Sequence, residues 1–360
     1  MQSRFLKIAS QRCRSSKIVG LGLTTLMSCM LCASIPAKTP TADRPIGVGG
    51  AQKFYGVNLA GGEFKSEVLP GKLGQDYIYP DKSVAQPFVT HGFNTVRVPI
   101  LWERLQPSPF KPLSDTEMQA LDASIDAIDG FSNIVLDVHN YASYRGQRLD
   151  QIDGGGLMLA DLWTRLAQHY IGSKKIIFGI MNEPHDIDPH DWRKMVDQSV
   201  AAIRKAGAKN LLLIPGSNWT GAHSWTAGGS SSNAAAFSSF KDPDDNFVYE
   251  LHQYLDTDSS GTHDSCVDAN LVRARMSEVT EWLRTHEVKA FLGEFGGPQG
   301  AECLASLDAL MNYTDMNNDV WVGWTYWAGG PWWGDYSFSV QPRDGHDKAQ
   351  ITILRKHFGH

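Results

Sequence analysis

Short apolar runs recur along the chain from about residue 54 to its end, and a loop and a longer amphipathic stretch follow each run. Runs of this length, rich in β-branched and aromatic residues, are typical of buried β-strands. Successive runs begin 31 to 43 residues apart, which leaves room for a helix and two loops. The predicted strands begin near Phe54, Asn94, Asn133, Ile176, Asn210, Phe247, Lys289 and Val320.

The amphipathic stretches between the strands carry apolar residues at helical spacing. Residues 114–129 and 191–207 are two examples, and Ser114 and Asp191 are placed to cap them. The Ser- and Ala-rich segment 230–239 is instead interpreted as an exposed loop. Strands that alternate with helices favour a parallel sheet, and eight repeats favour closure. The sequence therefore predicts a single α/β domain over residues 53–360, folded as a (β/α)8 TIM barrel.

The first 37 residues have a different pattern. Basic residues precede the apolar run IVGLGLTTLMSCMLCA, and small residues follow up to Ala37. This order is typical of a secretory signal peptide, and the run is shorter than the ~20 residues of a membrane-spanning helix. Residues 38–52 are interpreted as a linker. We therefore expect a secreted protein, extracellular or periplasmic. Alternatively, residues 26–29 form a lipoprotein site, which would tether the protein through lipid on Cys29.

The cysteines and the overall charge narrow the class of protein. Three of the five cysteines lie in the predicted leader, which leaves Cys266 and Cys303. In an oxidising compartment these two most simply form one disulfide. A zinc site is a poorer alternative because the pair has no CxxC partner. A net charge of -6 with scattered basic residues gives no electrostatic footprint for nucleic acid, and no protein partner is indicated.

Polar residues end most of the predicted strands. In a parallel barrel these carboxyl ends meet at one edge, where active sites lie. Individually each has an ordinary explanation: Asn182, Glu183 and Pro184 could simply turn the chain, and a single His is often a hydrogen-bonded core residue. Buried unpaired charges are costly, however, so polar groups from six strands indicate a site. The residues at these ends are Arg97, His139, Asn140, Asn182, Glu183, His252, Tyr254, Glu294 and Trp327.

Two carboxylates stand out in this set, Glu183 and Glu294, and the sequence has no obvious motif for a Ser or Cys nucleophile. Glycoside hydrolysis needs only such a pair, one protonated to assist the leaving oxygen and one ionised. Arg97 and the hydroxyl of Tyr254 near Glu294 would favour its charged form, which leaves Glu183 as the acid. The amide of Asn182 can bind a sugar 2-hydroxyl.

Tryptophan supplies the second feature of a sugar site, because indole faces suit the apolar face of a pyranose. Half of the eleven Trp residues could simply be core. Trp332 and Trp333, in the loop AGGPWWGDY, are the candidate sugar platforms. Segment 185–191, HDIDPHD, is rich in metal-ligand types but is interpreted as a solvated loop with a helix cap. No metal and no cofactor are expected.

Seven motifs in chain order resemble those of glycoside hydrolase family 5: GVNLAGGEF, TVRVP, DVHNY, IMNEP, LHQY, LGEFGG and the Trp before AGG. The resemblance runs from about Phe54 to the end. The GGEF opening and the cysteine pair are most similar to the fungal-type endoglucanase branch, found also in bacteria.

This resemblance implies a retaining endo-β-1,4-glucanase, a cellulase, on a (β/α)8 barrel, with Glu183 as acid/base and Glu294 as nucleophile. It implies a β-glucan polysaccharide or oligosaccharide as substrate. Two alternatives remain open, namely a mannanase or mixed-linkage glucanase of the same family, and a carbohydrate-binding protein that has lost catalysis. Both glutamates argue against the second. The residues that would line the subsite of the cleaved sugar are Arg97, His139, Asn182, His252, Tyr254 and Trp327.

Overall fold

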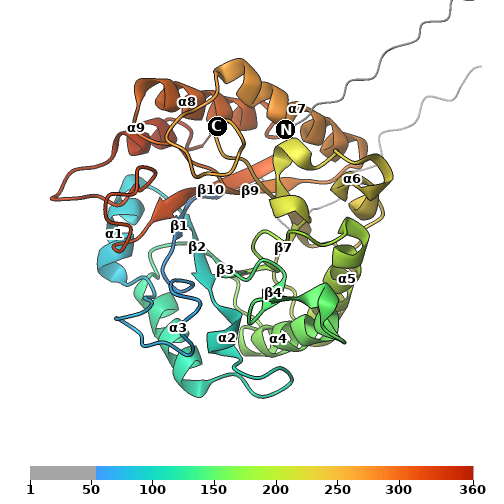
Figure 1. The fold of residues 1–360 in the computed structure, drawn as a ribbon. Helices are drawn as coiled ribbons and strands as arrows, with labels where there is room; N and C mark the ends of the chain where they lie inside the picture. Colours follow the sequence, from blue (N-terminus) through green and yellow to red (C-terminus); the bar gives the residue numbers. More distant parts are fainter. Residues whose placement is uncertain (1–53, 360) are drawn as a thin grey trace, which may run out of the picture. The chain divides into compact units, whose positions relative to one another are not determined.

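The computed structural model describes residues 54–359, and within them eight parallel strands close into a barrel surrounded by helices (Figure 1). The predicted leader 1–37, its alternative lipid site at Cys29 and the predicted linker 38–52 lie outside the described residues. The predicted (β/α)8 barrel is therefore confirmed.

Each barrel strand begins within two residues of its predicted start. In spatial order the barrel runs β1-β10-β9-β8-β7-β6-β3-β2, and β2 pairs with β1 to close it. A short antiparallel hairpin, β4 (Ser143–Tyr144) with β5 (Gln147–Arg148), follows β3. The barrel strands are β1 (Phe54–Leu59), β2 (Thr95–Ile100), β3 (Asn133–Val138), β6 (Ile176–Gly179), β7 (Leu212–Pro215), β8 (Phe247–His252), β9 (Ala290–Glu294) and β10 (Trp321–Gly329).

The helices lie outside the strands, as Figure 1 shows. Four 3-10 turns lie in the loops: Leu149–Gln151, Asn218–Thr220, Ala222–Ser224 and Gly229–Ser231. The α-helices are α1 (Lys82–His91), α2 (Trp102–Leu105), α3 (Asp115–Ala127), α4 (Gly155–His169), α5 (Pro189–Lys205), α6 (Asn233–Phe237), α7 (Ala269–Thr285), α8 (Ala301–Met316) and α9 (Ala349–Arg355).

One of the two predicted helix caps is confirmed and the other is wrong. Ser114 caps α3 by accepting a hydrogen bond from the backbone N–H of Glu117. Asp188, and not Asp191, caps α5 by accepting from the backbone N–H of His190. The helix begins earlier because Pro189 occupies its first position, where a missing N–H costs nothing.

Segment 230–239 is not the exposed loop that its composition predicts. Its middle part forms α6, and Ser232 caps the helix by accepting from the backbone N–H of Ala235. Phe237 is only 1% exposed and packs against Trp225 and Tyr249. One buried aromatic ring therefore holds this segment against the barrel.

The barrel interior is closed by apolar side chains near the beginnings of the strands. Seven of the eight strands contribute one residue each to this buried layer. Because the layer fills one end of the interior, polar groups can gather only at the other end, where the strands finish. The layer consists of Phe54, Val135, Ile177, Leu213, Val248, Phe291 and Val322.

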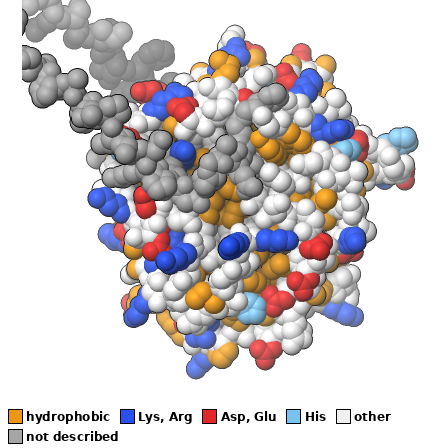
Figure 2. Space-filling view, turned by 180° about the vertical axis from the view of Figure 1, so that it is seen from behind, with side chains coloured by type: hydrophobic (Ala, Val, Ile, Leu, Met, Phe, Trp, Pro, Cys, Tyr) orange, Lys and Arg blue, Asp and Glu red, His pale blue; other side chains and the backbone are white. Residues whose placement is uncertain are grey.

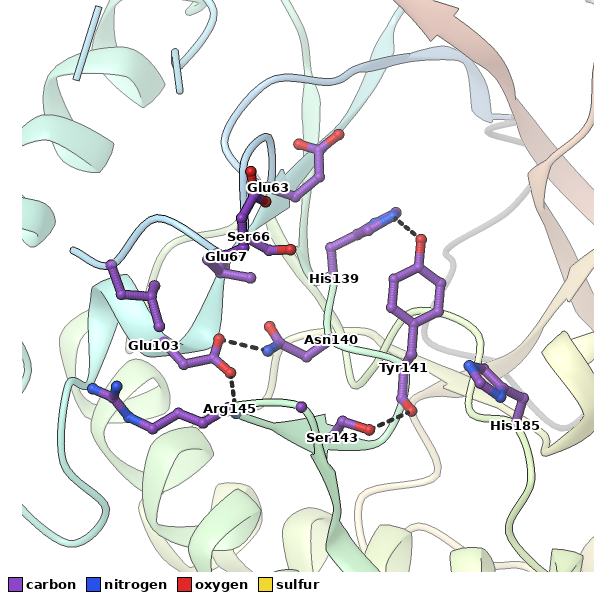
Figure 3. A pocket seen from close by; sticks show the side chains of 13 residues that line it. Glu63, Ser66, Glu67, Glu103, His139, Asn140, Tyr141, Ser143, Arg145 and His185 are labelled. Atoms are coloured by element: carbon purple, nitrogen blue, oxygen red, sulfur yellow. Dashed lines mark hydrogen bonds between the residues drawn. The ribbon is translucent and has the colours of Figure 1, made fainter. Parts of the chain in front are cut away.

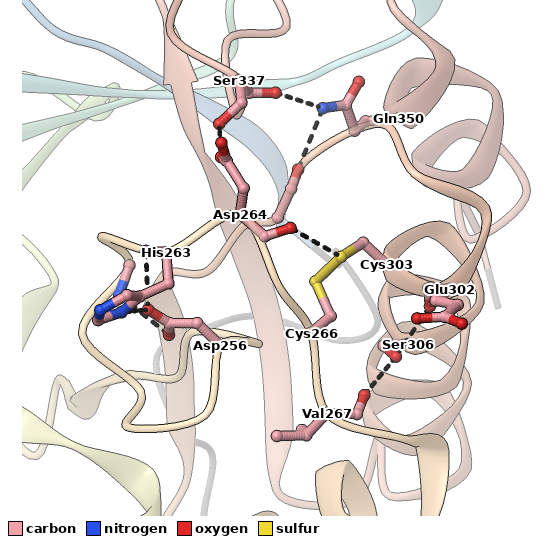
Figure 4. Close-up of a disulfide and its surroundings, with 12 residues drawn as sticks. Asp256, His263, Asp264, Cys266, Val267, Glu302, Cys303, Ser306, Ser337 and Gln350 are labelled. Atoms are coloured by element: carbon pink, nitrogen blue, oxygen red, sulfur yellow. Dashed lines mark hydrogen bonds and ion pairs between the residues drawn. A yellow bond between two sulfur atoms is a disulfide. The ribbon is translucent and has the colours of Figure 1, made fainter.

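The predicted disulfide between Cys266 and Cys303 is present and joins the loop after β8 to α8 (Figure 4). The two residues are 37 apart in sequence. A closed loop of that size corresponds to a stabilisation of about 4 kcal/mol in the chain-entropy picture.

Charges are mixed over the surface opposite the view of Figure 1. Figure 2 shows Lys and Arg side chains interspersed with Asp and Glu on this face. Within residues 54–359, no helix has the length and apolar character needed to cross a membrane.

Candidate active site

Arg97 organises the polar groups at the carboxyl ends of the strands. Its side chain, on β2, is fully buried. One guanidinium nitrogen donates to Glu294 Oε1 at 2.8 Å, and the other donates to Asn182 Oδ1 at 2.8 Å. Two groups that are far apart in sequence, at the ends of β9 and β6, are thereby fixed relative to each other.

Glu294, the last residue of β9, is only 3% exposed. Besides the bond from Arg97, its Oε2 accepts a hydrogen bond from the hydroxyl of Tyr254 at 2.8 Å. Both expected contacts are therefore present. Burial nevertheless raises the pKa of Glu294, and the cations His252 and Arg97 oppose this rise without cancelling it.

Glu183 follows the end of β6 and lies opposite Glu294. Its backbone has φ +40°, in the left-handed region that non-glycine residues rarely adopt and that often marks functional sites. His252 Nδ1 lies 2.8 Å from Glu183 Oε1. Single atoms of Glu183, His252 and Glu294 all lie within 4.8 Å of one another. The turn thus aims one carboxyl group at the other across a short gap.

A second chain of polar contacts lies beside Asn182. Its Nδ2 donates to His139 Nε2 at 3.2 Å, and His139 Nδ1 contacts Asp137 Oδ2 at 2.7 Å. Burial lowers the pKa of His139, but Asp137, with Glu63 and Glu294, outweighs burial and leaves that pKa raised. The imidazole stacks on Trp327 with ring centroids 5.6 Å apart. His139 therefore connects the amide of Asn182 to the aromatic wall of the site.

The prediction from sequence considers the ends of the strands and misses three buried polar residues of this network. Asp137 and Glu250 are fully buried carboxylates that lie 3.2 and 2.9 Å from Arg97 nitrogens. Asn58 on β1 accepts from Arg97 at 2.9 Å. Burial lowers the pKa of Arg97, but the carboxylates around it outweigh burial and raise that pKa. Each missed carboxylate precedes a predicted histidine by two residues, so strand periodicity places both on the histidine's face.

Asn140 has a supporting place in the structure. Its Oδ1 accepts from the backbone N–H of Trp102 at 2.8 Å, and its Nδ2 donates to Glu103 Oε2 at 2.7 Å. Both ends of the amide are therefore engaged by the protein, and Figure 3 shows the contact with Glu103. Asn140 holds the loops after β2 and β3 together beneath the cleft.

A cavity of about 760 Å³ opens beside His139, walled by the loops after β1, β2, β3 and β6. Glu63, Tyr141 and His185 are among its lining side chains (Figure 3). Tyr141 OH lies 3.2 Å from His139 Nε2. The cavity is continuous with the network around Asn182 through His139, and its size suits several sugar units.

The tryptophans divide into core and cleft residues. Trp102 and Trp225 are fully buried, whereas Trp219 is 49% exposed and stacks on His185 at 4.8 Å. Trp332 is 38% exposed. Trp333 is partly buried, and its ring meets Trp327 edge-on at 5.7 Å. Trp333 therefore packs against the indole of Trp327.

Two groups of acidic and histidine side chains in the described part of the chain are compact enough to hold a cation. The first comprises Glu183, His252 and Glu294, whose contacts with one another and with Arg97 already explain its arrangement. The second lies on the loop after β8, where Asp256 accepts backbone N–H groups of residues 261–263. Segment 185–191 contributes to neither group. We assign no metal site to them.

Comparison with known proteins places this arrangement in a family. A family model described as cellulase, glycosyl hydrolase family 5, matches residues 52–330. Endo-beta-1,4-glucanase B of Emericella nidulans is 35% identical over 294 residues, which cover 81% of this chain and 87% of that protein.

Solved structures agree with the sequence matches. An endo-beta-1,4-glucanase from Xanthomonas axonopodis pv. citri superimposes with a TM-score of 0.83 at 43% identity, covering 85% of this chain and 98% of that chain. XacCel5A, solved in complex with cellopentaose, gives a TM-score of 0.83 at 45% identity, covering 85% of this chain and 99% of that chain. The chain therefore belongs to glycoside hydrolase family 5, the cellulase family, and is an enzyme that hydrolyses glycosidic bonds.

Proposed function

We propose that the protein is a retaining endo-β-1,4-glucanase that cleaves internal bonds of cellulose and related β-glucans, with Glu294 as nucleophile and Glu183 as acid/base. The observation that carries the proposal is the placement of one oxygen from each carboxyl group within 4.8 Å of the other. Retaining glycosidases hold their carboxyl groups about 5 to 5.5 Å apart, whereas inverting enzymes need about 6.5 to 9.5 Å to admit a water.

The reaction takes place in two steps. In the first, Glu183 gives its proton to the leaving oxygen while Glu294 attacks the anomeric carbon and forms a covalent glycosyl-enzyme. In the second, Glu183 takes a proton from water, which attacks the same carbon and releases Glu294. The two displacements together return the anomeric carbon to its original β configuration.

The residues around the glutamates stabilise the reacting sugar. Among the described residues, the Nδ2 of Asn182 donates one hydrogen bond, to His139, and its second N–H can bind the sugar 2-hydroxyl, an interaction that strengthens in the transition state. Trp327 offers its indole as the wall of the cleaved sugar's subsite, supported by His139 and Trp333. Trp332 is the more exposed platform candidate.

The substrate assignment rests on the relatives and on the shape of the cleft. The relatives are named endo-beta-1,4-glucanases, and XacCel5A was solved with cellopentaose. The cavity of about 760 Å³ beside His139 has room for sugar units on one side of the cleaved bond. We expect action on soluble or amorphous chains.

The enzyme is proposed to act outside the cytoplasm, as a catalytic domain of residues 53–360 that follows a signal peptide (1–37) and a linker (38–52). The Cys266–Cys303 disulfide supports this proposal because such bonds persist mainly in oxidising compartments.

The pH profile tests the role of Tyr254. Burial, with Glu294 beside it, raises the pKa of Tyr254 well above its usual value, so the hydroxyl remains a donor to ionised Glu294. In Tyr254→Phe the carboxylate loses this bond, its pKa rises further, and the acidic limb of kcat/KM should move upward by about one pH unit. Tyr141→Phe is the matched control, because its hydroxyl contacts His139. An acidic limb that stays in place in a folded Tyr254→Phe variant contradicts this role.

A panel of polysaccharides tests the activity. We expect new reducing ends and a rapid fall in viscosity on soluble β-1,4-glucan, with lower rates on mannan and on mixed-linkage glucan. A higher rate on mannan or on mixed-linkage glucan would reassign the substrate within the family. Binding without any new reducing ends would indicate a protein that has lost catalysis.

A further inference from the structure

His252 lies among three carboxylates that come from three different strands or their following loops. Its Nδ1 is 2.8 Å from Glu183 Oε1 and 3.6 Å from Glu294 Oε2. Its Nε2 faces Glu250 Oε1 at 3.5 Å. The ring is only 3% exposed, so water does not compete for either nitrogen. Both ring nitrogens therefore face a carboxyl oxygen inside the protein.

Glu250 is held in its charged form chiefly by the neighbouring guanidinium of Arg97. Its Oε1 forms an ion pair of 2.9 Å with Arg97 Nε. Its Oε2 has no hydrogen-bond partner among the described residues. Burial raises the pKa of Glu250, but the charges of Arg97 and His252 outweigh burial and hold that pKa below its usual value.

The backbone of β9 leaves space for this carboxyl group. A Cβ atom at Gly293 would lie only 2.3 Å from Glu250 Oε1, so a larger residue there would displace the side chain. The glycine immediately before Glu294 thus admits a third glutamate directly beneath the two proposed catalytic ones.

The charges around Arg97 indicate that His252 carries a second proton. Arg97 alone faces Asp137, Glu250 and Glu294, and Glu183 stands beside them across His252. Glu183 carries a proton in the resting enzyme proposed above, so this guanidinium faces three buried carboxylates, and the negative charge that remains is costly away from water. A neutral imidazole with its proton on Nδ1 would also point its Nε2 lone pair at Glu250 Oε1.

From this geometry we propose that Glu250 is a positioning residue that keeps His252 doubly protonated, so that Nδ1–H is always directed at Glu183. The proposal deepens the function proposed above and rests on it for the role of Glu183. When Glu183 releases its proton to the leaving oxygen, the Nδ1–H of His252 stabilises the carboxylate that forms. No proton leaves His252 in this step, so its charge is constant through the reaction.

The electrostatic surroundings agree with a cationic ring. Burial lowers the pKa of His252, but Glu294, Glu183 and Glu250 outweigh burial and raise that pKa to about 10. Arg97 is the opposing cation on the other side of Glu250. Since the pKa is raised, the proton is held throughout the neutral range and is lost only as the pH approaches that value.

Nuclear magnetic resonance of the ¹⁵N-histidine-labelled wild-type protein tests the protonation directly. The His252 signals, identified by their absence in His252→Asn, should show an imidazolium with two N–H groups at pH 7 and little titration up to pH 8. A neutral His252 at pH 7 would overturn the proposal. This measurement needs no altered Glu250, and it is decisive whether or not the enzyme proves to be retaining.

Glu250→Gln then tests the cause. Loss of a neighbouring opposite charge should lower the His252 titration midpoint by roughly 1 to 3 pH units. Asp137→Asn is the matched control, because it removes a buried charge beside Arg97 on the side of His139, away from His252. Its effect on the His252 midpoint should be clearly smaller.

Glu250→Gln should also lose more activity on glucan than on an aryl cellobioside with a good leaving group, which needs little proton donation. A His252 titration unchanged in folded Glu250→Gln overturns the role of Glu250.

Discussion

Glu294→Ala is expected to abolish turnover on every substrate, whatever its leaving group. Without this carboxylate no covalent glycosyl-enzyme can form, so the first step fails even when the leaving oxygen needs no proton. The loss should be on the order of 10⁶-fold in kcat, the scale found when the nucleophile of a serine protease is removed. Rates on polymer and on activated aryl cellobioside measure it.

The fold should tolerate this change. Arg97 keeps Asp137 and Glu250 as ion-pair partners after Glu294 is shortened, so no buried cation is left alone. Glu294→Gln is the matched control, since its amide oxygen can still accept from Arg97 and only the nucleophilic charge is lost. Both variants should melt near the wild-type temperature and be equally inactive. Substantial aryl cellobioside hydrolysis by either one would place the nucleophile elsewhere.

Glu183→Ala should lower the hydrolysis rate by a factor that depends on the leaving group of the substrate. Proton donation contributes about 10²- to 10⁴-fold to rate, so hydrolysis of glucan should fall by that factor. An activated aryl leaving group departs without a proton, so the first step should remain fast and the glycosyl-enzyme should accumulate. Kinetics of aryl release should then show a burst followed by slow turnover.

Added azide should restore turnover of Glu183→Ala, because this nucleophile needs no general base. It attacks the glycosyl-enzyme on the face that the leaving group occupied and gives a β-glycosyl azide. Glu294→Ala is the informative comparison, since azide there can only replace the missing nucleophile and give the α-azide. An α-azide from Glu183→Ala would contradict the roles given to both glutamates.

The barrel can be predicted from the sequence because its strands are buried on both faces. Continuous apolar runs such as IIFGIM mark such strands, and Asn or Pro at their ends limits their boundaries. The site can be predicted by the same reasoning, because the carboxyl ends of all the parallel strands lie at one edge of the barrel. Arg97, His139, Asn182, His252, Tyr254 and Glu294 do meet at that edge.

Other features depend on contacts that a single sequence does not contain. Asp137 and Glu250 lie inside strands, where a buried charge is costly without a partner, and the sequence alone does not show that Arg97 is that partner. Asp188 and Asp191 are equally good caps in composition, and Pro189 between them decides the helix start. Segment 230–239 is held in place because the ring of Phe237 packs between Trp225 and Tyr249, which lie outside the segment on either side.

The anomeric form of the first product tests the central claim most directly. Wild-type enzyme cleaving a soluble cello-oligosaccharide in an NMR tube should release the β-anomer first, with the α-anomer appearing only as mutarotation proceeds. This result is required if Glu294 forms a covalent intermediate that water then opens from the opposite face. Initial release of the α-anomer would mean a single displacement by water, and would contradict the nucleophilic role of Glu294 and the two-step role of Glu183.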